Sequence, residues 1–311
     1  MTEIDVARYS LQIDPHLHIW GWEIPVYLFL GGMAAGLMIL TSLLAMRKEE
    51  PSPAARWLAF AAPVLVSVGM GALFLDLAFK VHVLRFYLAF RWTSPMSWGA
   101  WVLVLVYPVS LLVALAGLDD AQAEKAGRFL GGLGLARPAA ALRAWAQHHL
   151  ARLRWANLVV GVGLGVYTGI LLSTLGARAL WSSALLGPLF LVSGLSTGAA
   201  FLMFFRLGEG ERHFVTRWDL LAIGLEVLLI VLFLVGLSTA SLEGKEAAGL
   251  LLGGRFTAEF WALVVIAGLA VPSLLEILEM RLHVRPTRVA PVLVLVGGFA
   301  LRWIMVAAGQ A

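Results

Sequence analysis

Eight long apolar stretches constrain the fold of this chain more than any other feature. A helix needs about 20 apolar residues to cross the core of a bilayer. Stretches of roughly that length lie at 23–46, 56–79, 95–117, 156–178, 181–205, 217–240, 259–280 and 288–308. The apolar runs are continuous and do not alternate as the strands of a membrane β-barrel do. We therefore predict an all-α integral membrane protein with eight transmembrane helices.

Composition excludes several classes of protein. Of the 311 residues, 60% are hydrophobic and 14% are charged, whereas soluble domains carry about 25% charged residues. A soluble enzyme and a nucleic-acid-binding protein are thereby excluded. The chain has no cysteine, which rules out disulfides, thiolate metal sites and cysteine-ligated iron–sulfur clusters within it.

The positions of the basic residues predict an orientation. The connections after the first, third, fifth and seventh stretches hold 15 Lys and Arg residues, and the opposite side holds 7. Basic residues concentrate on the cytoplasmic side of membrane proteins. We therefore expect both termini on the outer side, with residues 1–22 as an outer tail.

One connection and one repeated pattern allow two interpretations each. In the cytoplasmic connection 118–155, Leu142, Trp145, His149 and Leu153 recur at helical spacing, which fits an interfacial amphipathic helix or a solvated linker helix. The pattern of 28–36, with Gly32 and Gly36, recurs at 189–198, with Gly194 and Gly198. It indicates either a duplication into two four-helix halves or the common need of packed helices for small residues.

The positions of the histidines indicate whether this chain binds haem. All seven histidines lie in tails, connections or helix ends: His16, His18, His82, His148, His149, His213 and His283. A cytochrome with two haems needs paired histidines inside the spans, so we expect no haem and no metal in this chain.

Ionisable residues at membrane depth are functional candidates by default, and they form two sets. The first set lies at the predicted outer side, with one tyrosine inside the fourth span: Glu23, Tyr27, Asp76, His82 and Tyr167. The alternatives are an Asp76–Lys80 ion pair that holds a helix end, and a solvated His82. The second set lies in the last three spans: Asp219, Glu226, Glu276 and Arg302. We expect Glu226 to pair with Arg302, and the alternative for this set is a structural ion pair without transport.

Five segments, in order along the chain, resemble the NrfD-like family, the membrane subunits of polysulfide reductase and related complexes. They are YLFLGGMAAG (27–36), TSPMSWGAW (93–101), YTGILLSTLGARALW (167–181), LFLVSGLSTG (189–198) and GGFALRWIMVAAGQ (297–310). The TSPMSWGAW segment is the most specific of them. Ala179 departs from the pattern, because relatives usually have proline after Arg178.

The resemblance implies two four-helix bundles, one at 23–178, which includes the loop 118–155, and one at 179–311. It also implies a menaquinone or other quinone in the outer half of the first bundle, contacted by Tyr167 and by the position of Tyr27, where a relative carries histidine. Glu23 and His82 are alternative donors on that side of the quinone. Asp76 or Glu23 would exchange protons with the outer side.

The function implied is that of a haem-free, quinone-reactive membrane anchor subunit in the cytoplasmic membrane of a prokaryote. Its partners would be the lipid bilayer, an iron–sulfur electron-transfer subunit on the outer face and a molybdopterin catalytic subunit, with no nucleic acid. Asp219, Glu226, Glu276 and Arg302 would line a proton path through the second bundle. The alternatives are a secondary transporter or ion-conducting protein, and an anchor without redox chemistry.

Overall fold

A computed structural model describes residues 20–47, 51–77, 79–83, 85–88, 90–132, 134–175, 178–282 and 286–311. Eight helical segments within these ranges are long and apolar enough to cross a membrane. They are α1 (Glu23–Ala45), α2 with α3 (Pro53–Leu58 and Ala61–Asp76), α5 (Pro95–Gly117), α8 (Leu150–Ser173), α9 (Leu186–Met203), α10 (Glu209–Thr239), α12 with η2 and α13 (Thr257–Glu259, Phe260–Ala270 and Val271–Leu282), and α14 (Val289–Gln310). The predicted all-α fold, with eight helices able to span a membrane, is confirmed for the described residues, and most of the predicted outer tail lies outside them.

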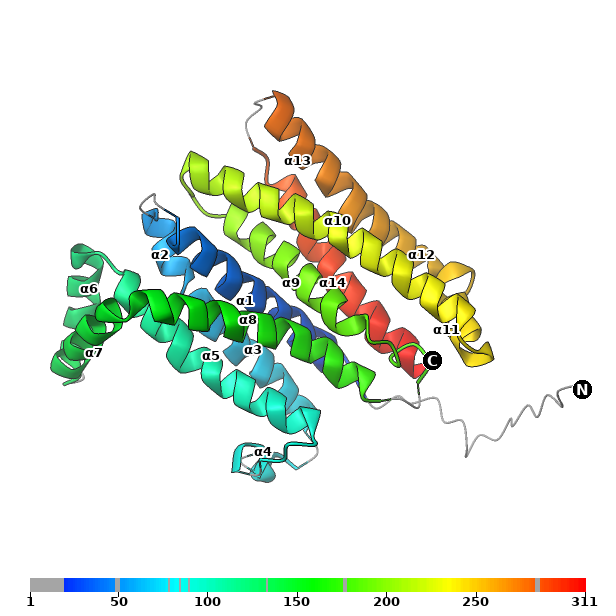
Figure 1. Ribbon diagram of the computed structural model, residues 1–311, viewed down its shortest axis with the longest axis horizontal. Coiled ribbons are helices and arrows are strands. Elements are labelled where there is room, and N and C mark those ends of the chain that lie inside the picture. The colour runs from blue at the N-terminus through cyan, green and yellow to red at the C-terminus, as the bar shows by residue number, and fades with distance from the viewer. Residues whose placement is uncertain are drawn as a thin grey trace, which may run out of the picture.

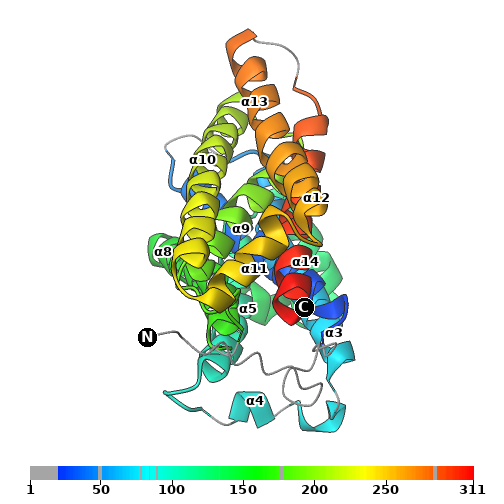
Figure 2. The same ribbon diagram turned by 90° about the vertical axis from the view of Figure 1, so that its right-hand side faces the viewer.

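The remaining helices are short and lie at the ends of the long ones (Figures 1 and 2). They are η1 (Lys80–His82), α4 (Arg85–Leu88), α6 (Asp120–Gly131), α7 (Ala136–His148) and α11 (Leu242–Leu252). Figure 2 shows α4 beyond the ends of the long helices, below α3 and α5. In Figure 1, α6 and α7 extend away from the start of α8.

Helices α1 and α9 lie at the centre of the structure (Figure 1). Helix α1 packs on α3, α8 and α9, and α9 packs on α8, α10 and α14. Helix α5 closes one side against α8 and α3, and η2 and α13 close the other against α14. The first four spans and the last four are thus joined through contacts of α1, α8, α9 and α14.

The two ends of this assembly are tied by polar contacts, which we use to name them. At the Trp20 end, the backbone N–H of Trp20 donates to Gln310 Oε1 at 2.9 Å. At the Arg47 end, Arg47 Nη1 donates to the carbonyl of Gly210 at 2.9 Å. The first described residue and the last helix thus meet at one end. Which end faces the cytoplasm stays a prediction from the basic residues.

Glycines bring α1 and α9 into backbone contact. A Cβ added at Gly198 would lie 2.7 Å from the carbonyl carbon of Gly36, and one at Gly194 would lie 2.6 Å from the carbonyl oxygen of Gly32. No side chain fits between these helices, which explains the small residues four apart. The two similar sequence segments therefore contact each other. This geometry fits both a duplication and a shared packing requirement.

Some predicted helix boundaries are wrong, for local reasons. The amphipathic helix expected across 142–153 is two elements, because α7 ends at His148 and α8 begins at Leu150. Nδ1 of His149 lies 2.9 Å from the carbonyl oxygen of Trp145 at this break. The second span is interrupted between α2 and α3, just before Pro63, whose ring and missing N–H disfavour a continuous helix.

The sixth span begins earlier than predicted. Helix α10 starts at Glu209 rather than near 217. The Glu211 carboxylate accepts from the backbone N–H of Gly208 at 2.9 Å and caps the first turn. Acidic side chains stabilise a helix N-terminus. The mostly polar residues 209–216 therefore extend this helix on the N-terminal side of its apolar stretch.

We predict that Gly198→Ala destabilises the protein by about 1–3 kcal/mol, because the added methyl group meets the backbone of α1. Gly224→Ala is the matched control, since Gly224 on α10 has no atom within 4 Å of an added Cβ. The melting temperature of the purified protein in detergent should fall for Gly198→Ala and not for Gly224→Ala. Equal melting temperatures for the two variants would contradict the backbone contact.

Candidate functional site

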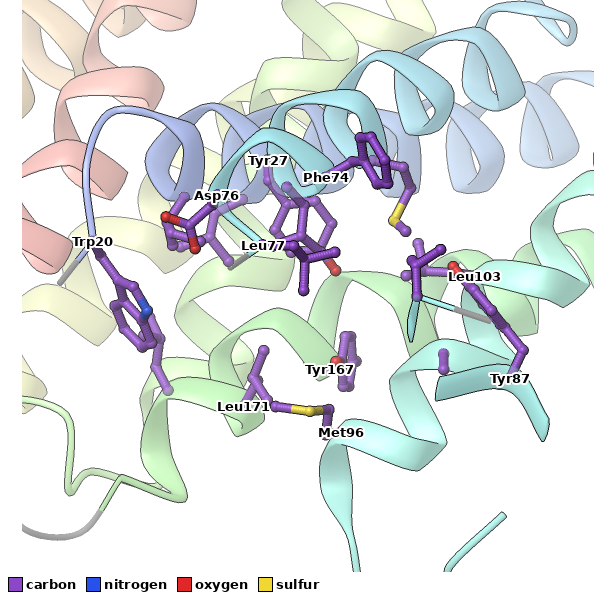
Figure 3. Close-up of a pocket in the computed structure, with 17 residues that line it drawn as sticks. Trp20, Tyr27, Phe74, Asp76, Leu77, Tyr87, Met96, Leu103, Tyr167 and Leu171 are labelled. Atoms are coloured by element: carbon purple, nitrogen blue, oxygen red, sulfur yellow. The ribbon is translucent and has the colours of Figure 1, made fainter. Parts of the chain in front are cut away.

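A cavity of about 250 Å³ lies between α1, α3, α5 and α8 near the Trp20 end. Its walls are mostly apolar, and polar groups enter from several elements (Figure 3). The side chains of Tyr27 from α1, Asp76 from α3, Tyr167 from α8 and Tyr87 from α4 all line it. The structure thus brings together three of the five residues of the first predicted set, which are Tyr27, Asp76 and Tyr167.

Three phenols face this cavity (Figure 3). Tyr27 and Tyr167 are 4% and 8% exposed, yet neither hydroxyl has a hydrogen-bond partner within the part of the chain that the structure describes. By contrast, the Tyr107 hydroxyl on α5 bonds to Ser67 Oγ at 2.9 Å. A buried hydroxyl without a partner is costly. The phenols are therefore available to a ligand with oxygen acceptors.

Gly99 leaves the space for the Tyr167 ring, whereas Gly69 is in ordinary contact with Tyr27. A Cβ on Gly99, in the TSPMSWGAW segment, would overlap the ring of Tyr167. A Cβ on Gly69 would lie 3.6 Å from Cδ2 of Tyr27. The absence of a side chain at position 99 leaves the space that the Tyr167 ring occupies against α5. This contact links two of the five segments on which the resemblance rests.

Glu23 and His82 do not line the cavity. Glu23 is half-buried, its carboxylate folds back over Gly21, and it lies close enough to Asp76 for the two charges to interact. His82 is exposed in η1, with its ring 6.4 Å from that of Phe79. The geometry therefore supports Asp76, rather than His82, as the ionisable group at the cavity.

The proposed Asp76–Lys80 ion pair does not form among the described residues. Asp76 ends α3 and lines the cavity, whereas Nζ of Lys80 lies 5.9 Å from the ring centroid of Phe74. The carboxyl group of Asp76 is thus not neutralised by this lysine. It stays available at the boundary between the cavity and the Trp20 end.

Trp20 closes the cavity at one side. Its backbone is held on α14, because Gln310 Oε1 accepts from the Trp20 N–H and Gln310 Nε2 donates to the Trp20 carbonyl at 3.1 Å. Its ring lies 5.1 Å from that of Trp181, centroid to centroid. Trp181 Nε1 in turn donates to the carbonyl of Met305 at 2.8 Å. Trp181 and residues of α14 therefore hold a wall of the cavity.

The second predicted set is also brought together, in the interior of the last four spans. Ser196 Oγ on α9 donates to Asp219 Oδ1 on α10 at 2.6 Å. The carboxyl group of Glu276 on α13 lies against that of Asp219, and both residues are at most 1% exposed. Both oxygens of Glu276 and Oδ2 of Asp219 lack hydrogen-bond partners within the described residues. Two buried carboxyl groups thus meet, and the cation that acts on Glu276 through its charge is Arg212 of α10.

Glu226 lies about two helical turns after Asp219 on α10, and Arg302 lies on α14. Arg302 is fully buried, and its Nη1 donates to Ser193 Oγ at 2.6 Å and to the carbonyl of Gly298 at 2.9 Å. Glu226 lines a small void with Ser193. The expected direct ion pair between Arg302 and Glu226 is not formed in the described part of the chain. The Ser193 hydroxyl and backbone carbonyls accept the hydrogen bonds of the guanidinium instead. Arg302 also touches α1, since a Cβ at Gly32 would lie 2.9 Å from its Nη2.

Sequence reasoning missed Tyr87 at the cavity. Tyr87 belongs to an aromatic run that is typical of a headgroup-level belt, and the structure places it on α4 in the cavity wall. Burial raises the pKa of the Tyr87 phenol above its ordinary value of 10.0, and the neighbouring Tyr107 phenol raises it further. This phenol therefore keeps its proton at neutral pH. Within the described residues, no three His, Asp or Glu side chains are placed to hold a metal ion.

Comparisons with known proteins agree with the resemblance over nearly the whole chain. The family model described as "Polysulphide reductase, NrfD" matches residues 12–311. The C subunit of polysulfide reductase from Wolinella succinogenes is 30% identical over 308 residues, which cover 94% of each protein. Protein NrfD of Escherichia coli K12 is 35% identical over 311 residues, which cover 94% of this chain and 95% of that protein. A protein NrfD homolog of Haemophilus influenzae is 26% identical over 307 residues, which cover 94% of each protein.

We predict that Gln310→Leu loosens the Trp20 wall, because it removes both side-chain hydrogen bonds to the Trp20 backbone. Each bond contributes about 1 kcal/mol, so the amide of Trp20 should exchange its hydrogen about tenfold faster or more. Hydrogen-exchange mass spectrometry of peptides that contain residues 20–22 measures this effect. Gln147→Leu, at a distant position in α7, is the control. Unchanged exchange at Trp20 in Gln310→Leu would contradict the hydrogen-bonded closure.

Proposed function

This chain belongs to the NrfD polysulfide reductase family, and from that premise we propose how it works as the membrane subunit of a redox complex. It exchanges electrons between a membrane quinone, menaquinone or ubiquinone, and a peripheral iron–sulfur subunit, which serves a molybdopterin catalytic subunit. The complex lies in the cytoplasmic membrane of a prokaryote. The first four and last four spans act as two four-helix bundles, with both termini and the cavity on the outer side.

One observation carries the proposal: buried phenols with unpaired hydroxyls line an apolar cavity within the described part of the chain. A quinone has a flat apolar ring and two carbonyl oxygens, so it fits walls of this kind. Tyr27 and Tyr167 would donate hydrogen bonds to the carbonyl oxygens, and side chains such as Leu103 and Leu171 would contact the ring. The family's relatives named above support the redox role without naming the quinone.

The residues of the cavity have two different roles, which are to bind the quinone and to transfer protons. When bound, a quinone supplies two-electron, two-proton redox chemistry. Tyr27 and Tyr167 hold and orient its oxygens, because their ring positions are fixed by packing against α3 and α5. Asp76 lies at the rim, between the cavity and the Trp20 end, and carries protons between the cavity and the outer aqueous phase. Glu23, beside Asp76, continues this path outward.

The second polar set supports a proton path through the last four spans. Asp219 and Glu276 are buried together, and Arg212 lies near enough for its charge to act on Glu276. No hydrogen bond from Arg212 to either carboxyl group is formed within the described residues, so a proton on the pair would lower the cost of burying two neighbouring charges. From there, Ser196, Ser193 and Arg302 continue toward Gly32 of α1. Helix α1 carries Tyr27 five residues earlier. The path therefore leads from the Arg47 end toward the wall of the quinone cavity.

We expect Tyr167→Phe combined with Asp76→Asn to lower quinone turnover at least about tenfold, since it removes one donor and the proton-exchanging group. The assay is oxidation or reduction of a soluble quinone analogue by the purified complex. Tyr107→Phe is the control, because that phenol bonds to Ser67 away from the cavity. Wild-type turnover by the double variant would overturn the site.

We expect Glu276→Gln to lower the number of protons moved per quinone in complex reconstituted into vesicles, while quinone turnover in detergent persists. The amide cannot exchange a proton with Asp219. Glu246→Gln changes an exposed carboxylate on α11 and should leave proton movement unchanged. An unchanged proton-to-electron ratio in Glu276→Gln would show that the buried pair is structural.

Two other functions make different predictions from this one. A secondary transporter would move a substrate into liposomes that hold this chain alone, and the buried carboxyl pair is the feature that favours it. An anchor without redox chemistry would retain no quinone when the complex is purified. Quinone that co-purifies with the complex, and is lost from Tyr167→Phe, separates the proposed function from both.

A further inference from the structure

A second cavity, of about 240 Å³, lies at the Arg47 end between α1, α2, α5 and α8. Its walls include Thr41 and Leu44 of α1 and Val113 of α5, and two arginines enter it, Arg56 from α2 and Arg154 from α8. It is remote from the quinone cavity, because Tyr27 and Leu44 are 17 residues apart on α1, or about 25 Å.

The two arginines differ in their bonding. Arg56 Nε donates to the carbonyl of Pro51 at 3.0 Å, and its Nη1 lies 3.5 Å from Oδ2 of Asp119. Arg154 has no hydrogen-bond or ion-pair partner in the described part of the chain, and its Nε is buried from solvent. A guanidinium carries five donors and is always charged. Arg154 is half-buried, and an unpaired guanidinium whose Nε is shielded from water is stabilised by an anion that accepts from its other donors.

The surroundings of Arg154 are those of a lipid headgroup region. Trp155 on α8 and Trp57 on α2 are 60% and 47% exposed, and exposed tryptophans mark the level of the headgroups. All but three of the twelve residues that line the cavity are apolar or glycine. A hydrated inorganic anion gains nothing from such walls, whereas a molecule with a phosphate at one end and methylenes at the other is stabilised by both.

We propose that this cavity binds an anionic glycerophospholipid. Arg154 donates to a phosphate oxygen, and the apolar side chains of α1, α5 and α8 contact the glycerol and the first methylenes of the acyl chains. Basic pockets between helices on the cytoplasmic side are known sites for anionic headgroups, and the excess of basic residues predicts that the Arg47 end faces the cytoplasm. Such a lipid would fix α2 and α8 against α1 and α5.

The test is native mass spectrometry of the full chain in detergent, titrated with phosphatidylglycerol or phosphatidylcholine of matched acyl chains. We expect phosphatidylglycerol to bind preferentially to the wild type, and about tenfold more weakly to Arg154→Gln, which loses the charge-assisted bonds. Arg152→Gln, an exposed arginine two residues earlier on the same helix, is the control and should bind as the wild type does. A third titration uses inorganic phosphate.

Ala59→Leu provides a second variant if Arg154→Gln does not fold. It fills part of the cavity and leaves the arginine in place, so it should also weaken the binding of phosphatidylglycerol. Wild-type binding by either folded variant would overturn the proposal. Equal binding of phosphatidylcholine, whose choline cation offsets its phosphate, would show that the net negative charge of the headgroup is not recognised and would overturn the proposal. Competition by inorganic phosphate would identify a site for a soluble anion instead of a lipid.

Discussion

The backbone contact between α1 and α9 is the constraint on which the rest of the structure depends. Gly36 lies against both Gly194 and Gly198, and no side chain larger than hydrogen fits there. Because α1 is held so close to α9, two faces of α1 contact different parts of the protein. Tyr27 faces the cavity of the first four spans, and Gly32 meets Arg302 of the last four. A single central helix therefore borders both polar sites.

The sites that we propose depend on polar groups without partners more than on charge alone. In an apolar medium, a donor or acceptor left unpaired is costly, so many intramembrane hydroxyls here bond to helix carbonyls, as those of Thr41 and Ser42 do. Within the described residues, the groups without partners include the phenols of Tyr27 and Tyr167, the Asp219–Glu276 pair, and Nε of Arg154. For these three places we have proposed partners that the protein chain does not itself contain, which are a quinone, a proton and an anion.

Much of this fold is predictable from sequence, because apolar length in a bilayer leaves few alternatives. Position near the membrane likewise predicts the candidate residues Glu23, Tyr27, Asp76, His82, Tyr167, Asp219, Glu226, Glu276 and Arg302, of which Glu23 and His82 do not line the cavity. What could not be predicted depends on tertiary contacts. Periodicity cannot show that Ser193 would take the guanidinium in place of Glu226, or that Tyr87 would turn into the cavity. The break at His149 is likewise not visible in the helical spacing of 142–153, because the backbone N–H of His149 still donates to the Trp145 carbonyl across it.

The attachment of Trp20 to α14 has a mechanical consequence. The last turn of α14 holds the backbone of Trp20, a wall of the cavity, while Arg302, eight residues earlier or about 12 Å along the same helix, belongs to the second polar set. Helix α1 joins the same two regions through Tyr27 and Gly32. Two stiff connectors therefore run in parallel between the sites, and a rigid-body shift of either helix displaces groups at both.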